Sequence, residues 1–364
     1  MVAQTLEGGK EVELPEAPNS MNRLLDQALQ DHPIIEGDSV TFVWRGKRAP
    51  QLIGDMTDWA EGNPIDLEKI APGLWATALA LPQDAYIEYA FWDGEQRVAD
   101  PLNPDTTPSG TGHKNHYFYM PGGGPTGLIR RGRSVPHGTI TRHTVENDFL
   151  LAGSKRTVLL YQPPTAEPCP LLVVLDGQDY RRRARIANIV DNLIAQGRIR
   201  PIALAMPYNG RGARGVEYAC SEATLVLLLY VLLELAQKEL SLVDLETNPG
   251  AYGILGASMG GLMALYAGLR APGVFGRVLS QSGAFALGEH DTVVFDLVRH
   301  GPVSPLHVWM SVGRYEWLLD CNRRMHRLLD ENGYDVAYHE HNGGHNYPAW
   351  RDHLGQGLEA LFGC

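Results

Sequence analysis

A serine flanked by glycines, between a predicted strand and a predicted helix, is the feature that most constrains this chain. Residues 252–265 read Tyr-Gly-Ile-Leu-Gly-Ala-Ser-Met-Gly-Gly-Leu-Met-Ala-Leu, so Gly256, Ser258 and Gly260 form a Gly-x-Ser-x-Gly motif. A serine at such a sharp turn holds a strained backbone, and the glycines leave room where a Cβ would collide with the strand and helix. The motif predicts an exposed nucleophile above a sheet, with the Met259 amide as a donor to an oxyanion. A glycine-rich turn with an incidental serine is the alternative.

The base expected to act on Ser258 is His345. The predicted strand 336–341 runs into Asn-Gly-Gly-His-Asn. A loop after the last strand is where an imidazole reaches a serine on the turn of an earlier strand. The two glycines let this loop turn tightly. The two histidines within the strand itself are less suitable, because they alternate along it and at least one points away.

A carboxylate that orients this imidazole is expected between Ser258 and His345 in the chain, the usual order for this architecture. The predicted strand 306–312 ends shortly before Glu316. From that place the carboxylate would accept a hydrogen bond from the imidazole and stabilise the imidazolium that forms. Asp320, one helical turn further on, is an alternative acid. A serine–histidine dyad with a water or backbone partner is another.

The second oxyanion donor is expected in the loop after an earlier strand. The apolar strand 171–175 runs into Asp-Gly-Gln-Asp-Tyr, and a backbone amide at Gly177 or Gln178 would supply the donor. An ordinary Asp-Gly turn is the alternative reading. Gln178 and Met259 are the expected oxyanion hole.

Charge and hydropathy limit the partners of the chain. With 31 basic and 42 acidic side chains the formal net charge is −11, whereas a general nucleic-acid surface needs surplus Lys and Arg. The apolar run 225–233 is much shorter than a membrane helix and predicts a buried core helix. The N-terminal residues lack the basic start and apolar core of a secretory signal, which predicts a cytoplasmic chain. The four cysteines are scattered and no metal-ligand spacing occurs, so free thiols and no metal or cofactor are expected.

Composition divides the chain into a β-prone front part and an alternating back part. Short β-prone runs separated by turn signals follow residue 38, which indicates a small antiparallel sandwich. Three consecutive glycines and an Arg-Arg-Gly-Arg run then form the strongest break. Beyond it, alternating strands and helices predict a mostly parallel sheet with helices on both faces. The predicted segments are a lead-in helix at 1–35, an all-β domain at 36–120, a linker at 121–134 and a catalytic domain at 135–364.

Five blocks of the chain, in their order and spacing, resemble the enterochelin (enterobactin) esterases and the wider family that includes esterase D and feruloyl esterases. They are Leu-Asp-Gly-Gln at 175–178, Arg-Gly-Val-Glu-Tyr at 214–218, Gly-Ala-Ser-Met-Gly-Gly-Leu at 256–262, Ser-Gln-Ser-Gly at 280–283, and Gly-Gly-His at 343–345 with Trp350 following. The resemblance implies an α/β-hydrolase fold. It places the family's nucleophile, acid and histidine on Ser258, Glu316 and His345. The chain departs from the family after residue 219, where Cys-Ser-Glu-Ala leads into a leucine-rich helix.

The front part resembles the immunoglobulin-like module, similar to glycogen-binding modules, that precedes such catalytic domains. Leu-Ile-Gly-Asp-Met-Thr-Asp-Trp at 52–59, with Leu-Trp at 74–75, carries this resemblance. The resemblance implies a domain that binds sugar or caps the active-site cleft. Trp44, Trp59 and Trp75 would stack on a ring in the first case, although core positions are the more common use of tryptophan.

The resemblance implies a small-molecule ester as substrate, first of all a siderophore lactone ester. An anionic ferric tricatecholate needs local cations. The expected substrate contacts are Arg181, Arg182 and Arg214, with Trp350 after the histidine loop; solvated helix arginines are the alternative. Two other functions are an acetyl or feruloyl esterase acting on carbohydrate, and a catalytically silent hydrolase-fold binding protein. The sequence leaves the oligomeric state open.

Overall fold

The chain forms two compact units in the computed structural model, which describes residues 18–59, 62–109 and 112–364. Residues 1–17 of the predicted lead-in segment therefore lie outside the described part. The first unit comprises the described residues up to Gly124 together with Gly313–Trp317 and His341–Ala349. The second unit comprises Pro125–Val312, Leu318–Glu340 and Trp350–Cys364.

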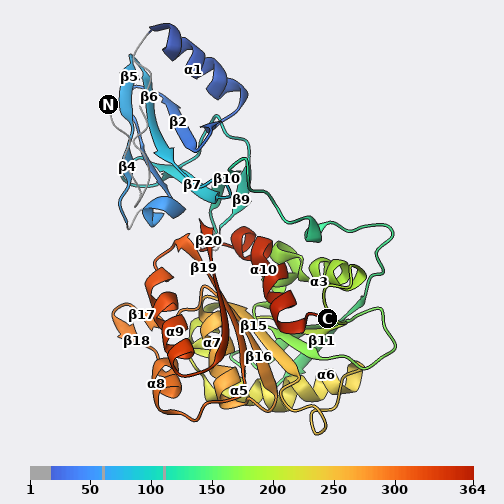
Figure 1. Ribbon diagram of the computed structural model, residues 1–364. Coiled ribbons are helices and arrows are strands. Elements are labelled where there is room, and N and C mark those ends of the chain that lie inside the picture. Colours follow the sequence, from blue (N-terminus) through green and yellow to red (C-terminus); the bar gives the residue numbers. More distant parts are fainter. Residues whose placement is uncertain (1–17, 60–61, 110–111) are drawn as a thin grey trace. The chain divides into compact units, whose positions relative to one another are not determined.

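Two antiparallel sheets form most of the first unit (Figure 1). One has the strand order β1-β2-β6-β5, and the other has the order β4-β3-β7-β10-β9 with β8 paired to β7. The elements of this part are α1 (Pro18–Gln30), β1 (Ile34–Glu36), β2 (Ser39–Arg45), β3 (Gln51–Gly54), η1 (Asp55–Thr57), β4 (Ile65–Asp66), β5 (Glu68–Ala71), β6 (Leu74–Ala80), β7 (Tyr86–Trp92), β8 (Arg97–Val98), β9 (Thr106–Pro108) and β10 (Lys114–Tyr119).

Side-chain alternation along β2 decides what covers each face of its sheet. Val40 and Phe42 are buried in a core that they share with Tyr89 of β7, a strand of the other sheet. Val43 faces the opposite way and packs in a second cluster with Ala28 of α1. The four-stranded sheet therefore has the second sheet on one face and the helix on the other.

An eight-stranded sheet organises the second unit, in the order β11-β12-β14-β13-β15-β16-β19-β20. The pairings from β14 through β13, β15 and β16 to β19 are parallel, whereas β11 and β12 pair antiparallel. The prediction of a mostly parallel sheet is confirmed. The strands are β11 (Thr139–Glu146), β12 (Lys155–Gln162), β13 (Leu171–Val174), β14 (Ala203–Pro207), β15 (Tyr252–Ala257), β16 (Phe275–Gln281), β19 (His307–Tyr315) and β20 (Asp335–Gly344).

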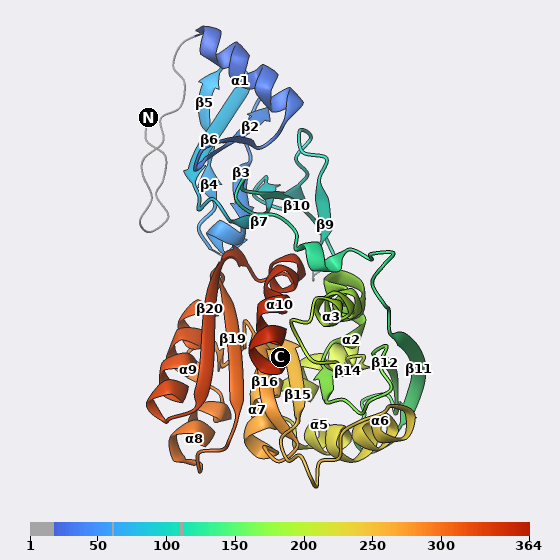
Figure 2. The same cartoon turned by 45° about the vertical axis from the view of Figure 1, so that its right-hand side comes forward.

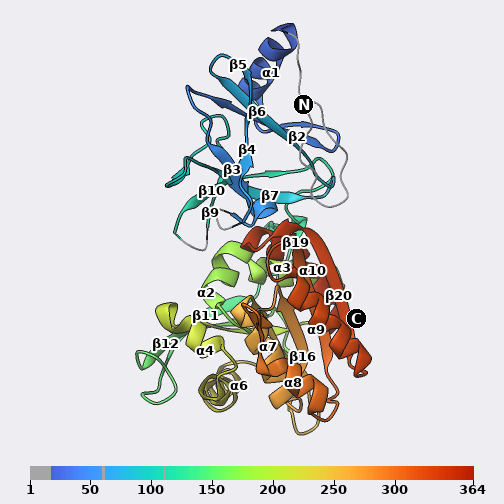
Figure 3. The same ribbon diagram turned by 90° about the vertical axis from the view of Figure 1, so that its left-hand side faces the viewer.

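Helices cover both faces of this sheet (Figures 2 and 3). A Cβ at Gly268 of α7 would lie 2.4 Å from the Val278 side chain, and one at Gly357 of α10 would lie 2.8 Å from the Leu279 side chain. Val278 and Leu279 are consecutive on β16 and point to opposite faces, so α7 and α10 cover opposite faces. The helices are α2 (Gly177–Asp179), α3 (Ile186–Ala195), α4 (Arg214–Tyr218), α5 (Glu222–Val226), α6 (Leu233–Glu239), α7 (Met259–Arg270), α8 (Val293–His300), α9 (Leu319–Glu331) and α10 (Tyr347–Phe362).

The predicted leucine-rich core helix is three consecutive helical segments. A π-helical stretch, η6 (Leu227–Leu232), joins α5 to α6, and Leu228 and Leu232 within it are buried. Within the described residues, no single helix is long and apolar enough to cross a membrane. The stretches Arg211–Tyr218 and Glu222–Glu239 meet the length and composition criteria only as a pair, bent by 96°.

Candidate active site

Ser258 occupies a strained turn between β15 and α7. Its φ of 59° and ψ of −124° are unusual for a residue that carries a Cβ. A Cβ at Gly256 would lie 2.2 Å from the carbonyl oxygen of Gly260, so only glycine fits where the strand passes the start of the helix. The Ser258 amide donates to the Gln281 carbonyl of β16 over 2.9 Å, which ties the turn to the neighbouring strand. Strand, strained serine and helix therefore follow one another as the motif predicts.

Met259 and Gln178 both lie in the first turn of a helix. Met259 is the first residue of α7, so its N–H has no acceptor within that helix. Gln178 is the second residue of α2, which begins after Asp176 in a left-handed conformation with φ 55°. The Gln178 Oε1 accepts a hydrogen bond from the Asn209 amide over 3.1 Å, which holds this loop through its side chain.

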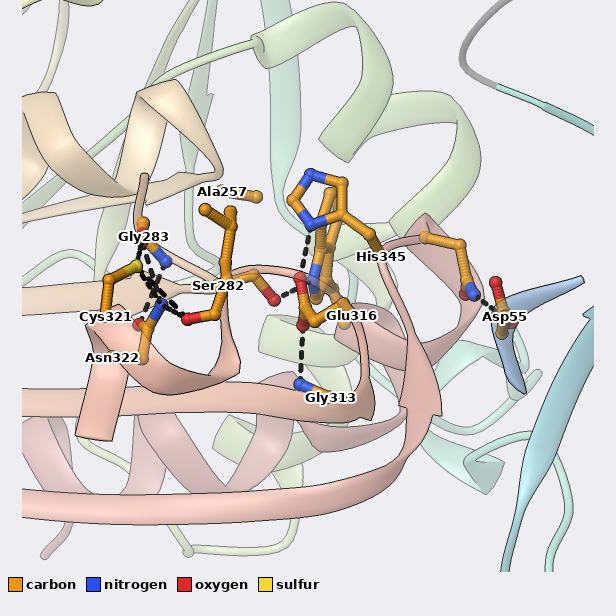
Figure 4. Close-up of polar contacts among 12 residues, drawn as sticks. Asp55, Ala257, Ser282, Gly283, Gly313, Glu316, Cys321, Asn322 and His345 are labelled. Atoms are coloured by element: carbon orange, nitrogen blue, oxygen red, sulfur yellow. Dashed lines mark hydrogen bonds and ion pairs between the residues drawn. The ribbon is translucent and has the colours of Figure 1, made fainter. Parts of the chain in front are cut away.

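The structure brings Glu316 and His345 together (Figure 4). The Nδ1 of His345 lies 2.5 Å from the Oε2 of Glu316. The other carboxylate oxygen, Oε1, accepts a hydrogen bond from the Gly313 amide over 2.6 Å. The side chain of Glu316 is 0% exposed and that of His345 is 15% exposed, so water screens this pair weakly.

Asp320, the alternative acid, has a different environment. It lies on α9, its side chain is 82% exposed, and its Oδ2 is 3.1 Å from the Nε of Arg324. That i, i+4 pair lies on the surface of the helix. The structure therefore pairs the histidine with Glu316 and places Asp320 in a surface ion pair.

Two residues beside His345 were not predicted from the sequence. Trp317 is 58% exposed, and its ring centroid lies 4.6 Å from that of the imidazole. Asn346 follows the histidine, and its Oδ1 accepts a hydrogen bond from the Ala349 amide over 3.0 Å at the start of α10. Asparagine is a favoured N-cap residue, and Asn346 lies directly before α10 in the structure, so its residue type is a signal for this position. No comparable pattern marks Trp317.

Arg214, a predicted substrate contact, forms an ion pair with Asp176. Its Nε and Nη2 donate to the two carboxylate oxygens of Asp176 over 2.8 and 2.6 Å, and its Nη2 also donates to the Ala257 carbonyl over 3.2 Å. The Asp176 side chain is 1% exposed. Because the Asp176 carboxylate pairs with Arg214, this arginine holds the loop before Gln178, and its contact with substrate stays a prediction.

Trp350, which the sequence predicts as a substrate contact, is a buried residue in the structure. It is 4% exposed, and its indole N–H donates to the Ser282 Oγ over 2.9 Å. Its carbonyl accepts a hydrogen bond from the Gln281 Nε2 over 2.8 Å, and the Tyr180 hydroxyl donates to the Gln281 Oε1 over 2.8 Å. Burial raises the pKa of Tyr180 well above its usual value, so its hydroxyl keeps the proton that it donates. This network belongs to the packing of α10 on the sheet.

Arg181 and Arg182 are exposed on the π-helical segment η4 (Tyr180–Ala184), which follows α2 directly. Their positive charges therefore face solvent three and four residues after Gln178.

Comparisons with known proteins point to one family. The family described as "Putative esterase" matches residues 151–361. The iron(III) enterobactin esterase of Dickeya dadantii is 26% identical over an alignment that covers 90% of each chain. The iron(III) enterobactin esterase of Escherichia coli K12 is 26% identical over 73% of this chain and 68% of its own.

Solved structures of similar proteins share the fold. The ferric enterobactin esterase from Salmonella typhimurium superposes with a TM-score of 0.75 at 23% identity, covering 90% of this chain and 95% of the other. The enterobactin esterase from Shigella flexneri, crystallised in the presence of enterobactin, superposes with a TM-score of 0.71 at 23% identity, covering 89% and 92%. The family match spans more than half of the chain, so the alternative of a catalytically silent binding protein is set aside. The chain belongs to the "Putative esterase" family and is an ester hydrolase.

Proposed function

We propose that the protein is a serine esterase that works through Ser258, His345 and Glu316. The observation that carries the proposal is the buried hydrogen bond between the Glu316 carboxylate and the His345 Nδ1. The strained turn at Ser258 supports its role as the nucleophile. The strands β15 and β19, which precede Ser258 and Glu316, are parallel members of one sheet, and residues that follow such strands share a sheet edge.

In this mechanism the Ser258 hydroxyl attacks the ester carbonyl carbon while the His345 Nε2 takes its proton. The Glu316 carboxylate stabilises the imidazolium through Nδ1. Collapse of the tetrahedral intermediate breaks the carbon–oxygen bond of the ester, and the imidazolium gives its proton to the departing alkoxide. Water then attacks the acyl-enzyme with His345 again as the base. The carboxylic acid leaves and the serine recovers its proton.

The negative oxygen of the tetrahedral intermediate needs donors that are already in place. We assign this role to the backbone amides of Met259 and Gln178, which lie in the first turns of α7 and α2. One such donor is worth about 3 kcal/mol in a serine hydrolase. The ion pair of Arg214 with Asp176 supports the assignment of Gln178, because it holds the residue that precedes α2.

We propose a siderophore lactone ester of the enterobactin type as the substrate. Two features support an aromatic, anionic ester: the exposed indole of Trp317 beside His345, and the exposed arginines Arg181 and Arg182. The names of the relatives from Dickeya dadantii and Escherichia coli support the same substrate class. A feruloyl or acetyl ester of carbohydrate is the second candidate, because the indole would stack equally well on a feruloyl ring.

We propose that the front part of the first unit is an immunoglobulin-like module. The two antiparallel sheets with one shared core support this assignment. We propose the boundaries that the sequence predicts: 36–120 for this module, 121–134 for a linker and 135–364 for the catalytic domain. The first unit also contains two segments from the predicted catalytic domain, Gly313–Trp317 and His341–Ala349.

The test of the catalytic proposal is Ser258→Ala, assayed with p-nitrophenyl butyrate and with ferric enterobactin. We expect the loss of Ser258 to lower kcat by at least about a thousandfold for both esters, because no nucleophile remains. Ser241→Ala is the matched control, since Ser241 is an exposed serine outside these elements, and it should keep full activity. Equal kcat for the native chain and Ser258→Ala would overturn the proposal.

A second experiment tests the substrate. Values of kcat/KM for ferric enterobactin and for methyl ferulate, measured under identical conditions, should favour enterobactin. A higher value for methyl ferulate would establish the second candidate in its place.

A further inference from the structure

We infer that Asp55, a residue of the N-terminal β-rich part, is a positioning residue for His345. The inference rests on the proposed function, since it takes His345 as the base. Asp55 begins η1 directly after β3 and is 4% exposed. It is a buried carboxyl group that the proposed mechanism does not use. The histidine loop, His341–Ala349, belongs to the same compact unit as Asp55.

Asp55 contacts the chain on both sides of His345. On the preceding side, a Cβ at Gly344 would lie 2.1 Å from the Asp55 Cγ, so the carboxyl group packs directly against the backbone of Gly344. On the following side, the Asn346 Nδ2 donates to the Asp55 Oδ2 over 3.1 Å. The backbone of His345 is therefore held at both of its neighbours by one carboxyl group.

Asn346 links this contact to the helix that follows. Its Oδ1 accepts the hydrogen bond from the Ala349 amide in the first turn of α10, while its Nδ2 binds Asp55. Both ends of the amide are thus engaged, and the side chain has one orientation that satisfies them. Loss of Asp55 would leave the Nδ2 end without this acceptor in a residue that is 7% exposed.

The β-rich part holds Asp55 in turn. Its Oδ2 also accepts a hydrogen bond from the Glu88 amide of β7 over 2.9 Å. The Glu88 carboxylate accepts from the Tyr86 hydroxyl over 3.1 Å and from the Asn115 Nδ2 over 2.7 Å. Polar groups of β7 and β10 therefore hold Glu88, whose amide binds the Asp55 carboxyl group.

The electrostatics of Asp55 support a positioning role. Burial raises its pKa well above the usual value, and the Glu88 carboxylate raises it further, followed by that of Glu316; the hydrogen bonds from the Glu88 amide and Trp59 lower it. Burial in these surroundings disfavours the ionised form of the carboxyl group. Its contribution is the hydrogen-bond acceptor that it presents to the histidine loop.

A shift of about 1 Å in a catalytic group lowers the rate by roughly a hundredfold. We therefore expect Asp55→Ala to lower kcat for p-nitrophenyl butyrate by about 10- to 100-fold, with KM changed less than about twofold. Asp55→Asn keeps a carbonyl oxygen that accepts from Asn346 and Glu88, so it should restore most of kcat. A role confined to folding would lower the folded fraction of the variant, whereas a positioning role lowers kcat in protein that is fully folded.

Asp84→Ala is the matched control. The exposed Asp84 also binds β20, where its Oδ1 accepts a hydrogen bond from the Asn342 Nδ2 over 2.7 Å, but Asn342 lies three residues before His345. We expect this variant to keep the native kcat. The double variant Asp55→Ala/Asn346→Ala should lose no more activity than the more impaired of the two single variants. Both substitutions remove the same hydrogen bond between Asn346 and Asp55.

Native kcat in folded Asp55→Ala, or additive losses in the double variant, would overturn the inference. Circular dichroism and thermal melting establish whether Asp55→Ala folds. If it does not, Asn346→Ala decides, because it removes the link and leaves Asp55 in place; native kcat there would also overturn the inference. Ser258→Ala separates the two proposals. If it is active, the proposed function fails; if it is inactive while Asp55→Ala keeps native kcat, only the positioning role fails.

Discussion

The indole of Trp317 lies against the imidazole of His345, with ring centroids 4.6 Å apart and ring planes inclined at 40°. Exposure of 58% is high for so large an apolar side chain. The indole therefore contacts the proposed base and also presents apolar surface to solvent. An aromatic ring of a bound ester would find a stacking surface next to the base.

Trp317→Ala should weaken the binding of aromatic esters selectively. We expect KM for methyl ferulate to rise about five- to tenfold, since an aromatic pair contributes about 1 kcal/mol beyond buried area. KM for methyl butyrate should stay within about twofold. Trp317→Leu, which keeps apolar surface without the ring, should behave like the alanine variant toward ferulate. Parallel increases for both esters would show that the indole has no preference for rings.

Glu316→Gln should lower kcat about a thousandfold or more, because an amide in place of the carboxylate neither stabilises the imidazolium nor holds the productive tautomer. Asp320→Asn should keep native kcat, since Asp320 is exposed and paired with Arg324. Steady-state kinetics on p-nitrophenyl butyrate measures both. A larger loss in the Asp320 variant would restore it as the acid.

Replacement of Arg181 and Arg182 together by glutamine should raise KM for ferric enterobactin several-fold at low ionic strength. Both side chains are exposed, so salt should diminish the difference between the native and variant chains. A neutral ester such as methyl butyrate should show no change in KM. An equal rise for both substrates would remove these arginines from the substrate site.

Arg214→Ala should destabilise the chain by about 3 kcal/mol, because it leaves the buried carboxylate of Asp176 without its ion-pair partner. Urea unfolding followed by circular dichroism measures the free energy of unfolding. Arg211→Ala, which truncates an exposed arginine three residues earlier, is the control and should change it by less than about 0.5 kcal/mol. Matching unfolding curves for the two variants would contradict a structural role for Arg214.

Thiol reactivity should depend on pH differently at buried and exposed cysteines. Burial raises the pKa of Cys169 to about 11 and that of Cys220 to about 12, whereas Cys364 is exposed. The thiolate is the reactive form, so at pH 8 iodoacetamide should modify Cys364 in the folded chain and leave Cys169 and Cys220 protonated and unmodified. Mass spectrometry counts the adducts. The Cys364→Ser variant lacks the exposed thiol. Rapid modification of this folded variant by iodoacetamide at pH 8 would contradict the expected protection of the buried thiols.

The sequence predicted the parts of the site that depend on one strand and the residues directly after it. Gly256 and Gly260 indicate the turn that strains Ser258, and the ends of two later strands indicate Glu316 and His345. The sequence does not show that Trp350 is buried, because its place after the histidine loop does not say which face of α10 it occupies. The sequence also does not show that Asp176, 38 residues earlier, pairs with Arg214.

The alternation of strands and helices and the motif at Ser258 by themselves determined a mostly parallel sheet and a candidate nucleophile, because strand, turn and glycine preferences act within a few residues. The tertiary structure decided which partners those residues meet. The link from Asp55 to Asn346 spans 291 residues, and no local preference encodes such a pairing. It exists because packing places a buried carboxyl group of the N-terminal β-rich part against the backbone beside His345, where a glycine at position 344 leaves room for it.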